Sequence, residues 1–333
     1  MRKFISILST GIIAMGVLSG CSSIDQEKSE GGKEEISKKV VKVVTPDGLP
    51  TIAIAKLIKE KPEIKVNYEI EYTIEKTAET LSTTVMKEEP DIAIVPSNMA
   101  SIVYNKTKNY QIAGTTGFGS SYIVSTEDIN NYEDLKGKTI MNIGKGLTPD
   151  ITAQYIISEK GLNTEGDVNF SYVNSPSELV PMIVSGKKNT AIVPEPALSA
   201  LMAKKENVKI FKGLNDEYKE IADSEHGYPQ ATIIVKKSFL EENKDFTNIF
   251  LDNVKEGIEW ANDNPSELAT YCEEIEVSTE KPIIEKSIER ANLKFVPIEE
   301  SKDIYKNYYK KLFDSNPKSL GGNIPDEGIF MER

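Results

Sequence analysis

The sequence of 333 residues is poor in the side chains on which most enzymes depend. Histidine occurs once, at His226, and after residue 20 arginine occurs only at Arg290 and Arg333. Histidine is the usual proton carrier and metal ligand, and arginine is the usual clamp for anions. One histidine and two cysteines supply neither a Ser-His-Asp arrangement nor a zinc site. We therefore expect no enzymatic activity, no metal and no other cofactor.

Cysteine is equally scarce, and Cys21 lies at the end of an export signal. It follows a positively charged start, an apolar run over residues 4–18 and two small residues. These small residues before a cysteine resemble a bacterial lipobox. We predict that residues 1–20 are a lipoprotein signal peptide, which is removed, and that Cys21 is lipidated. An ordinary secretory signal stays open, whereas the run is short for a transmembrane anchor.

A lipidated Cys21 leaves Cys272 without a disulfide partner. Cys272 lies on a helical stretch, and we expect it to be a packed free thiol. A diacylglyceryl thioether with an N-acyl chain such as palmitate exceeds the two chains needed for stable anchoring. We therefore expect the protein on the outer face of a bacterial cytoplasmic membrane, at a Gram-positive cell surface, with a Gram-negative periplasmic lipoprotein left open.

The mature chain is strongly acidic. Loss of Arg2 and Lys3 with the signal peptide changes the formal net charge from −12 to −14. Such a surface repels nucleic acid and anionic lipid, so we expect no nucleic-acid partner. The remaining length suits two domains better than one, and we take a monomer as the default.

The pattern of apolar and charged residues changes near residue 40. Residues 21–39 are charged and contain Ser and Gly without apolar periodicity, which indicates a disordered tether. Short apolar runs then alternate with amphipathic stretches, the pattern of an α/β protein with largely parallel sheets. The predicted strands are Val40–Thr45, Lys65–Tyr72, Asp91–Val95, Tyr110–Thr115, Ser121–Thr126, Thr139–Ile143, Val168–Tyr172, Thr190–Val193, Val208–Phe211 and Gln230–Lys236. After Ser238 the pattern predicts almost only helices: Glu242–Asn262, Ser266–Glu274, Lys281–Ala291 and Ser301–Ser315.

Two loops are built alike. The strand 40–45 runs into Pro46-Asp47-Gly48-Leu49-Pro50, and the strand 139–143 runs into Gly144-Lys145-Gly146-Leu147-Thr148-Pro149-Asp150; a helix follows each. Each loop is expected to present free backbone N–H groups and a positive helix end beyond the carboxyl end of a strand. Ligands of open α/β sheets bind at such ends. Alternatively, both are ordinary strand-to-helix turns with good caps.

The order of motifs resembles a known family. Asp91-Ile-Ala-Ile-Val-Pro-Ser-Asn98, Asp134-Leu-Lys-Gly-Lys-Thr-Ile140, Val193-Pro-Glu-Pro196 and Leu320-Gly-Gly-Asn-Ile-Pro-Asp326 occur in that order. From about residue 40 to 330 the chain is similar to the solute-binding proteins of ABC importers. The nearest group includes the binding proteins for nitrate, alkanesulfonates, taurine and thiamine-pyrimidine precursors.

This resemblance implies an α/β protein with the type II periplasmic-binding-protein fold. Two α/β lobes would enclose a ligand cleft, and the chain would cross between them near residues 115–122 and 227–231. Lobe one would be residues 40–117 plus 231–333, and lobe two residues 118–230. The implied partners are a small-molecule ligand, a membrane permease and its cytoplasmic ATPase.

The resemblance places the ligand on loops that follow strands. Carried over to this sequence, it predicts ligand contacts by Asp47, Gly48, Leu49, Ser97, Asn98, Thr115, Thr116, Gly146, Thr148, Asp150, Glu195 and Tyr228. Several of these residues also suit purely structural roles: Ser97 and Asn98 as helix caps, Asp150 as a first-turn acid, and Tyr228 as a core residue.

The nature of the ligand stays open. Carboxylates at Asp47, Asp150 and Glu195 favour an amine-bearing or pyrimidine-like solute, with stacking by Tyr228 or Phe118. Helix N-termini and hydroxyls would suit a sulfonate or nitrate instead. An enzyme of the thiamine-pyrimidine synthase type is a weaker alternative, because the cysteine-rich motif of that family is absent. An adhesin without a small ligand would need no paired glycine loops.

Overall fold

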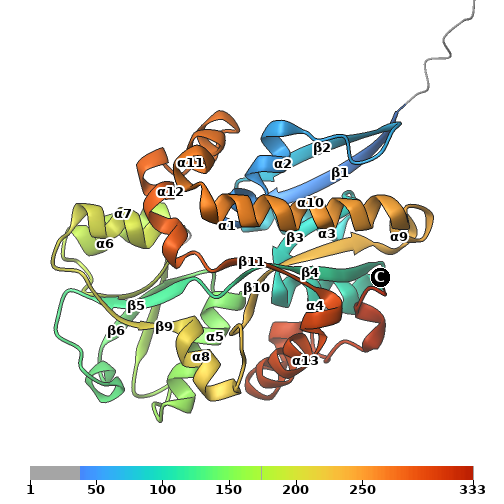
Figure 1. Ribbon diagram of the computed structural model, residues 1–333. Helices are drawn as coiled ribbons and strands as arrows, with labels where there is room; N and C mark the ends of the chain where they lie inside the picture. Colours follow the sequence, from blue (N-terminus) through green and yellow to red (C-terminus); the bar gives the residue numbers. More distant parts are fainter. Residues whose placement is uncertain (1–37, 174, 333) are drawn as a thin grey trace, which may run out of the picture. The chain divides into compact units, whose positions relative to one another are not determined.

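The computed structural model describes residues 38–173 and 175–332. Cys21, the predicted signal peptide and nearly all of the predicted tether lie outside these residues. Within them, β-branched and apolar runs form strands that alternate with helices, and the strands assemble into two separate sheets (Figure 1). The predicted α/β class is therefore confirmed.

The six-stranded sheet has the strand order β11-β4-β10-β3-β1-β2. Its strands come from the first and last parts of the chain: β1 (Lys39–Pro46), β2 (Tyr68–Glu75), β3 (Ile92–Pro96), β4 (Tyr110–Phe118), β10 (Pro229–Lys236) and β11 (Leu293–Pro297). The five-stranded sheet has the order β7-β6-β8-β5-β9. Its strands are consecutive: β5 (Ser121–Ser125), β6 (Thr139–Ile143), β7 (Asn169–Val173), β8 (Thr190–Pro194) and β9 (Lys209–Gly213).

Each of the ten predicted strands is present, but two expectations were wrong. The sheets are mixed: β1 pairs with β2 and β3 in parallel, whereas β10 is antiparallel to both its neighbours. The five-stranded sheet repeats this pattern with β6 and β5 in the corresponding positions. The prediction also missed β11, a five-residue strand inside the region expected to be helical, because its antiparallel partner β4 lies far away in sequence.

Helices cover both faces of the sheets. They are α1 (Leu49–Ala53), α2 (Ala55–Glu60), α3 (Ala78–Met86), α4 (Ser97–Thr107), α5 (Thr148–Glu159), α6 (Pro176–Val184), α7 (Ala197–Lys204), α8 (Leu214–Ala222), α9 (Lys237–Glu242), α10 (Lys244–Asp263), α11 (Pro265–Glu274), α12 (Lys281–Ser287) and α13 (Ile298–Ser315). Short 3₁₀ helices are η1 (Tyr132–Leu135), η2 (Ile288–Arg290), η3 (Pro317–Leu320) and η4 (Glu327–Ile329). The long helix α10 packs on β11 and β4, while α4 and α13 also pack against β4 (Figure 1).

The chain passes between the sheets at two adjacent places. The first passage is Gly119 and Ser120, between β4 and β5, and the second precedes β10. The two passages are bonded to each other: Gly119 N donates to Tyr228 O at 3.1 Å, and Ser120 N donates to the Gln230 side chain at 3.2 Å. The residue boundaries of the two predicted lobes stay a prediction.

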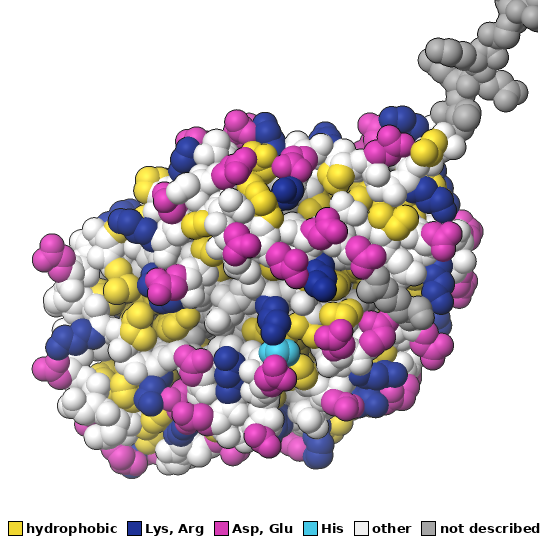
Figure 2. All heavy atoms as spheres, in the orientation of Figure 1, with side chains coloured by type: hydrophobic (Ala, Val, Ile, Leu, Met, Phe, Trp, Pro, Cys, Tyr) yellow, Lys and Arg dark blue, Asp and Glu magenta, His cyan; other side chains and the backbone are white. Residues whose placement is uncertain are grey.

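The surface of the described part carries charges of both signs. On the face in Figure 2, acidic and basic side chains are interspersed, and apolar side chains form small patches between them. Among the described residues, no helix has the length and apolar character needed to cross a membrane. Cys272 is buried and free, as predicted, and burial raises the pKa of its thiol to about 12.

Candidate functional site

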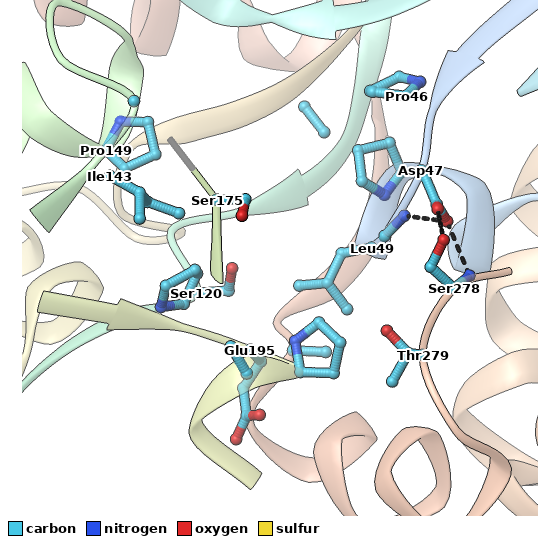
Figure 3. Close-up of a pocket in the computed structure, with 18 of the residues that line it drawn as sticks. Pro46, Asp47, Leu49, Ser120, Ile143, Pro149, Ser175, Glu195, Ser278 and Thr279 are labelled. Atoms are coloured by element: carbon cyan, nitrogen blue, oxygen red, sulfur yellow. Dashed lines mark hydrogen bonds between the residues drawn. The ribbon is translucent and has the colours of Figure 1, made fainter. Parts of the chain in front are cut away.

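A cavity of about 720 Å³ lies where segments that follow strands of both sheets meet. This volume is typical of pockets that hold small organic molecules. Figure 3 shows Asp47, Leu49 and Ser278 on one side of the cavity, with Ile143 and Pro149 opposite them. Both of the loops that the sequence singled out therefore contribute to its wall.

The predicted site residues fall into two groups. Five of them line the cavity: Asp47, Gly48, Leu49, Thr116 and Glu195. The other seven do not line it: Ser97, Asn98, Thr115, Gly146, Thr148, Asp150 and Tyr228. Their neighbours Pro96, Leu147 and Pro149 line the cavity instead. Contact of any of the twelve residues with a ligand stays a prediction.

Asp47 is held by groups from three segments. Its carboxylate accepts hydrogen bonds from the backbone and hydroxyl of Ser278 (Figure 3). It also accepts from Gly48 N at 2.9 Å and from Lys76 Nζ at 3.0 Å. Burial raises the pKa of the Asp47 carboxyl, but the bonds from Ser278 and Lys76 outweigh it and hold the pKa below its usual value. Asp47 is thus an ionised, fully engaged carboxylate in the wall.

Asp150 shapes the second loop from behind the wall. It is buried at the start of α5 and accepts hydrogen bonds from Gly146 N and Asn142 Nδ2, both at 2.9 Å. Gln154 Nε2 and the Tyr172 hydroxyl donate to it at 3.1 and 3.0 Å. Three of these donors bond Oδ1 and one bonds Oδ2, and all four belong to the chain, so the contacts of Asp150 are those of a loop-forming residue.

Glu195 joins the two halves of the wall. Its side chain is buried after β8 and accepts from Ser199 N at 3.0 Å, capping α7, and from Arg290 Nε at 2.7 Å. The carboxylate points away from the space between Leu49 and Ile143 (Figure 3). Burial raises the pKa of the Glu195 carboxyl even though Arg290 and Ser199 oppose that shift. Sequence reasoning gave Arg290 no role.

Asn98 and Thr148 bind each other rather than line the cavity. Asn98 Oδ1 accepts from Thr148 N at 3.2 Å and from Thr148 Oγ1 at 3.0 Å, and Asn98 Nδ2 donates to Gly146 O at 3.2 Å. Asn98 lies in the first turn of α4, which follows the six-stranded sheet, whereas Thr148 begins α5 of the other sheet. These bonds link segments that follow strands of the two different sheets.

Ser97 and Thr115 belong to a buried hydroxyl network behind the cavity. The Tyr305 hydroxyl lies 2.8 Å from Thr115 Oγ1 and 2.7 Å from Thr232 Oγ1, and Thr232 Oγ1 lies 2.7 Å from Ser97 Oγ. Ser97 does not cap α4 through its side chain. The network ties β4 and β10 to α13, which supports the wall without entering it.

Tyr228 is a core residue in the structure. It is fully buried, and its ring stacks on Tyr308 with the centroids 5.9 Å apart and meets Tyr218 edge-on at 5.6 Å. Stacking of a ligand on Tyr228 would require this cluster to open. The interpretation of Tyr228 as a packing residue therefore agrees with where the ring lies.

The fold agrees with comparisons to known proteins. The family model described as NMT1/THI5 like matches residues 69–268, which is more than half of the chain. The chain belongs to the NMT1/THI5-like family. This assignment bears out the family resemblance that the order of motifs indicated.

Two known proteins are similar to this NMT1/THI5-like protein in sequence or structure. It is 24% identical over 214 residues to "Putative binding protein YtlA" of Bacillus subtilis (strain 168), and the match covers 62% of each chain, so less than two thirds of that relative's length is spanned. A crystal structure of an ABC transporter from Parabacteroides distasonis has a TM-score of 0.76 and 26% identity, covering 88% of this chain and 99% of that one.

The periplasmic aliphatic sulphonate binding protein SsuA from Escherichia coli has a TM-score of 0.69 at 12% identity. The likeness covers 85% of this chain and 89% of that chain. The protein therefore has the periplasmic-binding-protein fold, as predicted, with two sheets, a cavity between them and two chain passages.

Sequence reasoning missed much of the wall of this NMT1/THI5-like protein. Lys76 and Ser278 hold Asp47, and Gln230 lies beside Ser120, yet none was singled out. A usable signal was present in the prolines: β1, β3 and β8 each end in a proline that lines the cavity. Seven wall residues are prolines in all, which makes the wall rigid and largely apolar.

His226 lies outside the wall. Its ring is tilted against Phe118 at 5.3 Å, and its Nδ1 lies 3.5 Å from Lys294 Nζ. Burial, followed by the charge of Lys294, lowers the pKa of the imidazole. Among the described residues no group of three or more His, Cys, Asp or Glu side chains is arranged to hold a metal ion.

Proposed function

We propose that this protein is the extracytoplasmic solute-binding lipoprotein of an ABC importer. In this role it captures a small organic solute in the cavity between its sheets and delivers it to a membrane permease driven by a cytoplasmic ATPase. The observation that carries the proposal is the cavity itself, which is large enough for a small molecule and draws its wall from both sheets. Similarity to a putative binding protein and to a crystal structure of an ABC transporter also supports the proposal.

The passages between the sheets suit capture by closure. In the described chain, the backbone passes between the two sheets at two adjacent segments, one before β5 and one before β10. A change of backbone conformation at these segments would move one sheet relative to the other. A solute that contacts both sides then favours the closed form, and only these differential contacts can do so. The bonds from Asn98 to Thr148 and from Glu195 to Arg290 would form or break in that movement.

A retained solute tests the capture. Full-length protein purified under mild conditions is expected to release a small molecule on denaturation, detectable by mass spectrometry. Ala200→Trp places a large ring in the wall and should reduce the retained amount at least ten-fold. Ala203→Trp is the matched control, because Ala203 is exposed on the same helix and does not line the cavity. Equal retention by both variants, or an empty wild-type protein, would contradict the proposal.

The lipid anchor is tested separately at Cys21. Cys21→Ala should move the protein from the membrane fraction of the cells into the medium, because a two- or three-chain anchor is lost. Cys272→Ala is the control, since Cys272 is a buried core thiol. Membrane retention of Cys21→Ala would remove the lipoprotein part of the proposal and leave solute capture untouched.

The ligand preference drawn from the sequence loses its basis. It rested on carboxylates of Asp47, Asp150 and Glu195 facing the ligand, but each accepts hydrogen bonds from the chain itself. An ammonium group would therefore find no free acidic partner among these three. A pyrimidine-like solute without charge remains compatible with the wall.

A further inference from the structure

Four donors on the six-stranded side of the cavity share one acceptor, the carboxylate of Asp47. Gly48 N, Ser278 N, the Ser278 hydroxyl and the Lys76 ammonium converge on the Asp47 carboxylate. Two backbone N–H groups, a hydroxyl and an ammonium are the set of donors that would hold an oxyanion. Here the chain supplies that oxyanion itself.

The opposite side repeats the arrangement. Gly146 N donates to Asp150, and Ser199 N and Arg290 donate to Glu195. These bonds take up one backbone donor of the loop before α5, Gly146 N, and one of the first turn of α7, Ser199 N, together with the guanidinium of Arg290. Donors of the kind that bind anions therefore also lie near the cavity on this side, and carboxylates of the chain accept from the three named here.

What remains facing the cavity is mostly apolar. Besides the seven prolines, the wall contains Leu49, Leu81, Ile143, Val180 and Leu293. Of the charged wall residues other than Asp47, Lys76 and Glu195, Lys204 and Glu280 are exposed to solvent. Glu75 is half-buried, and its carboxylate accepts from Thr84 Oγ1 at 3.0 Å.

One buried polar group in the wall has no partner. Several buried side-chain oxygens of the described residues lack a hydrogen-bond partner, and of these only the hydroxyl of Thr116 belongs to a residue lining the cavity. A buried hydroxyl without a partner is costly, so a hydrogen-bonding group on the ligand would find in Thr116 an unsatisfied neighbour.

We infer that the Asp47 carboxylate takes the place of an anionic ligand by binding Gly48 N, Ser278 and Lys76. We further infer that the cavity selects an organic solute with an apolar or aromatic body and no net charge. The inference rests on the proposed function and names the substrate class for that site. A sulfonate would meet a mostly apolar wall, carboxylates that are already engaged and the one uncharged hydroxyl of Thr116. An ammonium would meet carboxylates that already have cations beside them.

Three probes with the same ring test the selection: benzamide, benzylamine (as its ammonium form) and benzenesulfonate. Dissociation constants for the full-length protein are measured at pH 7 by isothermal titration calorimetry. Benzamide should bind at least ten-fold more tightly than either charged probe, because neither charge finds a free partner in the wall. Ala200→Trp should abolish benzamide binding, which places the probe in the cavity, and Ala203→Trp should not.

Asp47→Ala gives the sharper result, because it predicts a gain. Removing the carboxylate frees Gly48 N, Ser278 and Lys76, so benzenesulfonate affinity should rise at least ten-fold. Glu280→Ala is the control, since it removes the same charge from the wall without freeing these donors. A rise no larger in Asp47→Ala than in Glu280→Ala overturns the inference.

Failure of the inference can be told apart from failure of the proposed function. If wild-type protein binds benzenesulfonate or benzylammonium as tightly as benzamide, the inference falls but solute capture stands. If none of the probes binds at 10 mM (on the order of the weakest useful affinities), the inference also falls, because a largely apolar cavity of this size should admit a benzene ring. The retained solute, with Ala200→Trp as its blocking variant, then still decides the function.

Discussion

Gly119→Ala is expected to destabilise the protein by about 3 kcal/mol or more. A Cβ at this position would lie 2.2 Å from the Tyr228 ring, well inside contact distance. Neither the backbone at position 119 nor the Tyr228 ring can move easily to relieve this clash. The Gly119 backbone is bonded on both sides, to Tyr228 O and by Asn292, and the ring is fixed between Tyr218 and Tyr308. Chemical unfolding measures the loss.

Gly166→Ala is the matched control for this prediction. Its Cβ would lie 3.5 Å from Asn163, an ordinary contact, so the free energy of unfolding should change by about 0.5 kcal/mol at most. A double mutant isolates the cause: Tyr228→Leu should cost clearly less in the Gly119→Ala protein than in wild type, because the clash is then relieved. Strictly additive losses would show that the clash is not the source.

Asp150→Ala should have the second large effect, about 3 kcal/mol in the free energy of unfolding. The substitution leaves four donors without their acceptor, and two of these, Asn142 Nδ2 and Gly146 N, fix the loop before α5. The loop contributes Gly144 and Leu147 to the cavity wall, so retention of solute should fall together with stability. Equilibrium unfolding and mass spectrometry of the retained solute provide the two measurements.

Two variants bracket the role of Asp150. Asp150→Asn keeps the shape but turns an amide toward a donor, so we expect a smaller loss than for Asp150→Ala. Asp263→Ala removes an exposed carboxylate from the end of α10 and should leave stability nearly unchanged. If Asp150→Ala cost less than about 1 kcal/mol, the bonds seen at this carboxylate would contribute little to the loop.

Local sequence predicted the elements better than their pairing. Runs such as 40–45 and 139–143 are rich in β-branched residues, and their character as strands does not depend on distant partners. The antiparallel direction of β5 and β10 depends on where the chain returns, which no local pattern records. The five residues of β11 become a strand only because β4 offers a free edge.

The same limit applies to the site. Loop positions followed from strand ends, so the two glycine-bearing loops were found correctly in the cavity wall. The role of a polar side chain was not readable, because it depends on partners far away in sequence. Asp47 meets Ser278, and Glu195 meets Arg290, across separations of 231 and 95 residues. A carboxylate that looks available in the sequence is thus engaged in the folded chain.

The strand order also determines which of the two sheets can form first during synthesis. β3 and β4 do not pair with each other, because β10 lies between them. Strands β1 to β4, within residues 39–118, therefore emerge from the ribosome before their sheet can be completed, which requires residues 229–236. The five-stranded sheet needs only residues 121–213, so the half that is made second is the first that can close. Until residues 229–236 have been made, β3 and β4 lack the strand that lies between them and keep open edges.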